Sequence, residues 1–151
     1  MRRLAILTTV VGLACGGGAP RPPAPQSTQE TLQQFLAAVQ AKDLQRMGDL
    51  WGTERGPASE WMKGPELQQR LTVIQKYLAH VGYRVVEGPL AGTDASRRTY
   101  RVELQRQRCN AMLPIDLVRA KSGGWLVFDV HLEAAGNPAA ACPPADSGTR
   151  P

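Results

Sequence analysis

Three side chains late in the sequence, Asp116, Asp129 and His131, have the chemistry of a general acid or base. Carboxylate and imidazole groups transfer protons when burial or a neighbouring charge brings their pKa close to the working pH. One function to consider is therefore a small lyase or isomerase that uses Asp116 or Asp129 as its general base. That reaction needs the carboxylate inside a pocket, so the face on which each residue lies decides between catalysis and another role.

The alternation of side chains argues against a pocket position for these groups. The last predicted strand, residues 125–133, has its better apolar face formed by Leu126, Phe128, Val130 and Leu132. Asp129 and His131 then lie on the opposite face, although the reverse assignment stays open because that face also carries Trp125 and Val127. Asp116 alternates out of phase with its apolar neighbours, which are Leu113, Ile115 and Leu117. We therefore predict no catalytic residue and a binding function.

The sequence contains no pattern typical of a metal site, a phosphate-binding loop or a catalytic nucleophile. The histidines and cysteines fall at no metal-ligand spacing, so we predict no metal site. The glycines at 16–18 lack the preceding strand and following helix that a phosphate-binding loop requires. The candidate nucleophiles all lie in turn contexts rather than on a nucleophile elbow, namely Ser59, Ser96 and Ser122. We also predict no cofactor.

Five arginines gather in one part of the sequence: Arg97, Arg98, Arg101, Arg106 and Arg108. The formal net charge is +5, but residues 28–133 carry 14 basic and 12 acidic residues and are nearly neutral. A nucleic-acid-binding domain needs clustered excess positive charge, so we predict no nucleic-acid partner. We expect the arginines on a solvated sheet surface. The alternative is a site for an anionic partner, such as lipid head groups, lipopolysaccharide or an acidic protein.

Aromatic residues are the best candidates for ligand contact. Trp61 and Met62 lie in an irregular segment, where an aromatic ring and a flexible thioether can form the mouth of a pocket. Tyr100 is the third residue that we assign to this pocket. The alternative for Trp61, as for the other tryptophans, is a place in the core or at its rim.

The N-terminus has the layout of a secretory signal peptide. Arg2 and Arg3 precede an uncharged, mostly apolar run from Leu4 to Ala14, and small residues flank Cys15. A helix that crosses about 30 Å of hydrocarbon needs about 20 apolar residues, so this run is too short to remain as a transmembrane span. We predict that residues 1–14 are a signal peptide.

The stretch Gly12-Leu13-Ala14-Cys15 resembles the lipobox of bacterial lipoproteins, in which the cysteine is acylated and becomes the new N-terminus. Ala14 and Gly16 fit this pattern, whereas Gly12 stands where the commonest lipobox has leucine. The resemblance implies a lipid anchor on Cys15, and two or more acyl chains hold a protein durably at a membrane. It implies an exported cell-envelope protein, anchored in the outer membrane and facing the periplasm. The alternative is an ordinary cleaved signal with Cys15 free or disulfide-bonded.

Both ends of the chain are rich in proline, glycine and small residues. We predict that residues 15–27 form a lipidated cysteine with a disordered tether, and that residues 134–151 form a disordered tail. The 106 residues between them, 28–133, have the size of one domain. In an oxidising compartment Cys109 and Cys142 can pair, but their spacing leaves that pairing open.

Apolar periodicity predicts helices first and strands second. Helices are expected at 28–42, 44–51 and 64–81, and strands at 83–87, 98–107, 111–120 and 125–133. Ser27 and Asp43 are the expected caps of the first two helices. Helices followed by an antiparallel meander predict an α+β fold.

This order resembles the NTF2-like superfamily, also called cystatin-like. The resemblance lies in the paired helices TLQQFLAAVQAKDLQRMGDLW and the closing strand SGGWLVFDVHLE. It implies N-terminal helices packed on a curved antiparallel sheet, a cone that often holds an apolar pocket at its wide end. Members include isomerases, dehydratases and polyketide cyclases as well as binding and assembly modules, so the fold alone implies no activity. The partners it implies are a small apolar ligand, another envelope protein, or a second copy in a homodimer.

Overall fold

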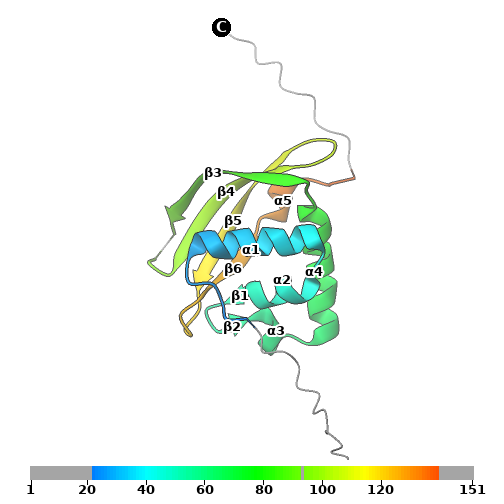
Figure 1. Ribbon diagram of the computed structural model, residues 1–151. Coiled ribbons are helices and arrows are strands. Elements are labelled where there is room, and N and C mark those ends of the chain that lie inside the picture. The colour runs from blue at the N-terminus through cyan, green and yellow to red at the C-terminus, as the bar shows by residue number, and fades with distance from the viewer. Residues whose placement is uncertain (1–21, 93, 140–151) are drawn as a thin grey trace, which may run out of the picture.

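The computed structural model describes residues 22–92 and 94–139, so the predicted signal peptide and Cys15 lie outside the described residues. A four-stranded antiparallel sheet with strand order β3-β4-β5-β6 carries the helices on one face (Figure 1). Its strands are β3 (Gly82–Ala91), β4 (Arg97–Gln105), β5 (Ala111–Arg119) and β6 (Trp125–Val130). The longer helices are α1 (Thr28–Ala41), α2 (Leu44–Leu50) and α4 (Gly64–Leu78). The predicted α+β class is confirmed.

Helix starts follow the predicted capping chemistry. The Ser27 hydroxyl accepts the Glu30 backbone N–H at 3.2 Å, and the Asp43 carboxylate accepts the Arg46 backbone N–H at 2.9 Å. The Glu30 side chain does not complete the capping box, because its carboxylate accepts from the Gln34 amide at 2.9 Å. The Asp43 cap lies at the corner at which α1 gives way to α2.

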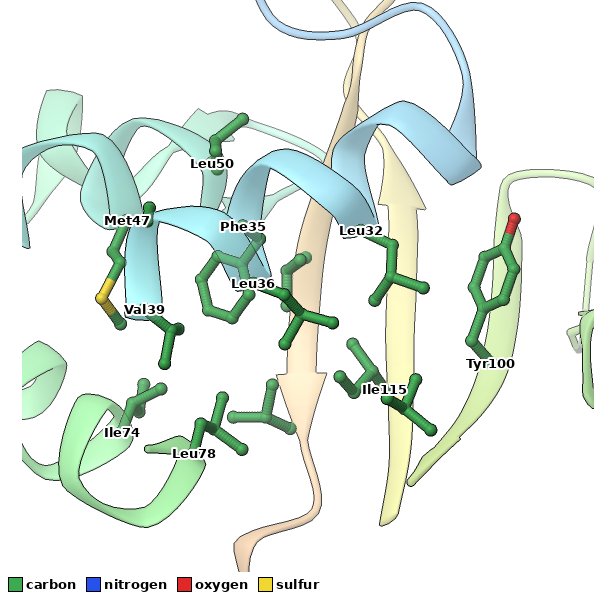
Figure 2. Packing of buried hydrophobic residues seen from close by; sticks show 14 of the residues in the cluster. Leu32, Phe35, Leu36, Val39, Met47, Leu50, Ile74, Leu78, Tyr100 and Ile115 are labelled. Atoms are coloured by element: carbon green, nitrogen blue, oxygen red, sulfur yellow. The ribbon is translucent and has the colours of Figure 1, made fainter. Parts of the chain in front are cut away.

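The core fills the space between the helices and the sheet. Figure 2 shows Leu32, Phe35 and Leu36 of α1 between the strands and the neighbouring helices. Phe35 and Leu36 are completely buried, as are Met47 of α2 and Leu78 of α4. The sheet contributes the inward-facing members of β4 and β5, which are Tyr100, Val102, Leu104, Leu113, Ile115 and Leu117. The helical faces and the sheet face thus meet in one apolar interior, as their sequence periods predict.

Strand β6 differs from its prediction in its face and its end. The pairing with β5 shifts between Asp116 and Leu117, so that Phe128 has no register partner on β5 and forms a bulge. Trp125, Val127 and Val130 therefore join the main core, whereas Leu126 packs into a smaller cluster on the outer face. The predicted core face was therefore wrong for Leu126 and Phe128 but right for Val130 and Leu132, because the bulge breaks strict alternation partway along the strand. The strand also ends at Val130 rather than at residue 133.

Short elements join the ends of the domain to the sheet. After β6 comes α5 (Leu132–Ala135), and its Ala135 is buried in the core. Before α1, the Pro25 carbonyl accepts the Trp125 N–H at 2.8 Å, and Ala24 packs against the outer-face cluster. Residues at both predicted disordered ends thus contact the folded domain.

Three further short elements form one corner of the molecule. The strands β1 (Gly52–Thr53) and β2 (Gly56–Pro57) make a small hairpin, and α3 (Ala58–Trp61) follows it directly. Trp51 forms a parallel bridge with Val127, which attaches this corner to the free edge of β6. In Figure 1 the corner lies beside the start of β6 and below α2.

Candidate functional site

The structure brings the three predicted acid–base candidates together on the outer face of the sheet, where His131 and Asp116 are in contact. His131 Nε2 lies 3.0 Å from Asp116 Oδ2, and the Thr99 hydroxyl donates to Asp116 Oδ1 at 2.6 Å. The other imidazole nitrogen, Nδ1, lies 3.1 Å from a carboxylate oxygen of Glu133. Asp129 is the cross-strand partner of Asp116 in the β5–β6 ladder, and its carboxylate accepts the N–H of the next residue at 2.8 Å. As predicted, Asp116 lies on the face opposite the core.

The surroundings of His131 favour its protonated form. The hydrogen bond with Asp116 raises the pKa of His131 above its ordinary value, burial opposes that shift, and Glu133 adds to it. Both ring nitrogens face carboxylates, so the imidazolium can donate to both at once. The arrangement ties the start of α5 to β5.

The five arginines considered as an alternative anion-binding site do not form one patch. Arg97 pairs with Glu54 at 2.6 Å, and Arg101 pairs with Glu87 at 3.4 Å. Arg98 donates to the Arg97 backbone carbonyl at 2.6 Å.

The last two of the five arginines lie at the far end of the sheet. Arg106 donates to the Tyr77 carbonyl at the end of α4 and to the Ala135 carbonyl of α5, and burial lowers its pKa. It therefore caps two helix C-termini, where a cation is stabilised by the helix dipole. Arg108 is exposed and, with His80, borders a cavity of about 380 Å³ that Cys109 also lines.

Cys109 is disulfide-bonded. The other two cysteines of the chain, Cys15 and Cys142, lie outside the described residues. The predicted pairing of Cys109 with Cys142 therefore stays a prediction.

The three predicted pocket residues are separated. Trp61 is 50 % exposed and lines a cavity beside the β1–β2 hairpin. Met62 follows it as the half-buried cap of α3. Tyr100 is 3 % exposed in the main core, and its hydroxyl lies 2.8 Å from the Thr28 hydroxyl. Tyr100 is thus a core residue, because β4 alternates it with outward-facing arginines.

A mostly apolar surface hollow runs along α4, and the sequence did not predict it. It has a volume of about 490 Å³ and is lined by Trp51, Glu66, Gln69, Arg70, Val73, Ile74 and Leu132. We call this set the α4 groove. Its residues come from α4, from the end of α2 and from α5, so only the folded chain brings them together. The signal available in the sequence was Val73, which lies off the predicted core stripe of its helix.

Side-chain geometry makes the α4 groove apolar at its floor and charged at its rim. The Trp51 indole N–H donates to the Phe128 carbonyl at 3.3 Å, so the ring presents carbon to the groove. Val73 is 46 % exposed. Glu66 and Arg70 form an ion pair at 3.0 Å on one turn of the helix. The groove can therefore cover an apolar ligand while its charged groups stay paired in water.

Residues 22–92 and 94–139 hold no helix long and apolar enough to cross a membrane. Within these ranges, no group of three or more histidine, cysteine, aspartate or glutamate side chains is placed to bind a metal ion.

Comparisons with known proteins give likeness of structure alone. No family model matches the sequence, and no curated protein matches it. The chain is similar to a crystal structure of an NTF-2 like protein of unknown function from Shewanella oneidensis MR-1. The TM-score is 0.41 at 14 % sequence identity, and the match covers 67 % of this chain and 95 % of that chain. At this level of similarity the comparison assigns neither a ligand nor an activity.

Proposed function

We propose that this chain is an envelope lipoprotein, held at a membrane by an acylated Cys15, whose domain binds a small apolar ligand without catalysis. The observation that carries the binding role is the α4 groove, about 490 Å³ in volume. Ligand sites in proteins are typically concave, mostly apolar and about 300–1,000 Å³ in volume. The lipobox-like sequence that ends at Cys15 supports the anchor.

A charge placed in the α4 groove tests the binding role. Val73→Glu puts a carboxylate at an exposed groove position, and Val81→Glu is the matched control because Val81 is 60 % exposed and lies outside the groove. The neutral fluorescent probe N-phenyl-1-naphthylamine is titrated into residues 16–151 of each form. We expect Val73→Glu to weaken binding roughly tenfold, which corresponds to about 1.4 kcal/mol. Equal affinity in all three forms would contradict the proposal.

A second candidate function is a lyase or isomerase with Asp116 as its general base. It is favoured by the contact of Asp116 with His131 and by a cavity of about 230 Å³ that Asp116 borders together with Arg97 and Arg98. Deuterium exchange at the α-carbon of small ketones, followed by NMR, tests it. Exchange that Asp116→Asn removes would favour the enzyme. An exchange rate that is the same with and without protein would count against the enzyme and in favour of the binding role.

A further inference from the structure

A second hollow, separate from the α4 groove, lies between the β1–β2 hairpin and the outer face of the sheet. Its volume is about 260 Å³, and it is lined by Thr53, Glu54, Arg55, Trp61, Arg97 and Phe128. We call it the Trp61 cavity. It differs from the α4 groove in that its ion pair, Arg97 with Glu54, is less exposed than the Glu66–Arg70 pair of that groove.

The backbone around the Trp61 cavity is held by hydrogen bonds. The hairpin pairs Gly52 with Pro57, and its Glu54 carbonyl accepts the Lys121 N–H of the β5–β6 turn at 2.9 Å. The Trp61 indole N–H donates to the Gly56 carbonyl at 3.3 Å. The polar edge of the indole is therefore occupied inside the protein. Half of the residue is exposed, and it offers an apolar surface from a fixed position.

The polar wall is an ion pair supported by an aromatic ring. The Arg97 guanidinium lies 4.2 Å above the centre of the Phe128 ring and pairs with the Glu54 carboxylate at 2.6 Å. The two side chains are 31 % and 41 % exposed. A guanidinium has five N–H donors and a carboxylate about four acceptor positions, so one contact leaves most of them available. Donors and acceptors thus stand side by side next to the indole.

This combination selects among classes of ligand. A purely apolar ligand would remove the water that hydrates the ion pair and would offer no hydrogen bonds in its place, which costs free energy. A simple anion would meet the Glu54 carboxylate as well as Arg97. A hydroxyl group both donates and accepts, and so suits the pair. A sugar ring carries hydroxyl groups around its edge and an apolar C–H face that can cover an indole.

We propose that the Trp61 cavity binds one ring of a neutral oligosaccharide. The C–H face of the ring lies on Trp61, and its hydroxyl groups hydrogen-bond to Glu54 and Arg97. The volume of about 260 Å³ falls just below the usual range for a whole drug-sized ligand, as expected for one ring of a longer chain. This site does not depend on the α4 groove, so either proposal can fail alone.

The test titrates chitotetraose, cellotetraose and maltotetraose into the full chain, solubilised in a zwitterionic detergent without a sugar head group. Calorimetry gives the affinity, and the indole N–H signals in ¹H–¹⁵N spectra locate the site, with Trp61→Phe assigning its signal. We expect at least one sugar to shift the Trp61 signal saturably. Trp61→Ala and the shape-preserving Glu54→Gln should each weaken binding roughly tenfold, whereas Val81→Ala should leave it unchanged.

Three outcomes would overturn the proposal. The first is that none of the three sugars binds at concentrations up to about 10 mM, because a site with a higher dissociation constant would be too weak to be useful. The second is that the shift falls on the Trp51 or Trp125 signal instead. The third is that Glu54→Gln and Trp61→Ala bind as tightly as the unaltered chain.

Discussion

His131 Nε2 lies 3.0 Å from the carboxylate of Asp116, across the point where β6 ends and α5 begins. Of the two side chains, His131 is 33 % exposed and Asp116 30 % exposed, so water screens the pair only in part. The contact fixes the turn that carries Leu132 into the α4 groove. A change in the charge of His131 should therefore affect the stability of this end of the domain.

The stability contributed by His131 should fall as the pH rises. Its pKa is raised in the folded state, chiefly by the hydrogen bond with Asp116, so the folded chain binds this proton more tightly than the unfolded chain. The contribution is complete below the unfolded pKa of about 6.5 and is lost as the pH passes through the higher folded pKa. Urea unfolding at pH 5.5 and 8.5 should show a larger gap between the unaltered chain and His131→Gln at pH 5.5. An equal gap at both pH values would contradict this assignment.

Loss of Phe35 should leave a cavity at the centre of the core. Phe35 is completely buried between α1 and the sheet (Figure 2). Phe35→Ala should lower the free energy of unfolding by about 3–5 kcal/mol, as measured by urea denaturation. Val81→Ala, at a 60 % exposed position, is the control and should change it by less than about 0.5 kcal/mol. A small effect at Phe35 would mean that the core is not packed around it.

The β1–β2 hairpin requires glycine at position 52. A Cβ there would lie 2.3 Å from the Gly56 carbonyl oxygen, which is far closer than contact. Gly52→Ala should therefore destabilise the domain by about 1–3 kcal/mol. Gly64→Ala is the matched control, because a Cβ at Gly64 meets nothing within 4 Å, and it should be neutral or slightly stabilising. Thermal unfolding of the two variants compares them directly, and equal melting temperatures would count against the hairpin geometry.

Cys109 should be joined to Cys142. Cys109 is disulfide-bonded, and acylation of Cys15 would leave Cys142 as its partner. Peptide mapping by mass spectrometry without reductant should recover the two linked peptides. Cys142→Ser should lower the free energy of unfolding by roughly 2–4 kcal/mol, because the bond constrains the unfolded chain. A Cys109–Cys15 peptide would instead contradict the anchor.

Helices α1, α2 and α4 could be predicted because local signals define them. Ser27 and Asp43 cap their helices through their own side chains, and apolar residues recur at helical spacing. The face of β6 could not be predicted, since the bulge at Phe128 depends on its pairing with β5. Strand β3 runs to Ala91 although Gly88 and Pro89 argue for a break, because an edge strand tolerates proline.

The candidate sites were less predictable than the fold. Trp61 was assigned to a pocket from its irregular segment, and it lines one. Its neighbours Glu54, Arg97 and Phe128 come from the hairpin and from two strands, so only tertiary structure joins them. The contact between Asp116 and His131 has the same origin. Such contacts could not be predicted from the sequence, because the residues lie far apart along the chain and strand pairing and bulges decide which side chains meet.

The lipid anchor is tested most directly by the mass of the N-terminal peptide. The chain is expressed in a bacterium, and its membrane fraction is compared with that of a Cys15→Ser form. We predict that the unaltered protein begins at Cys15, carries a diacylglycerol and at least one further acyl chain, and stays with membranes in carbonate buffer. The Cys15→Ser form should lack this mass. An unacylated, soluble product from the unaltered chain would contradict the account.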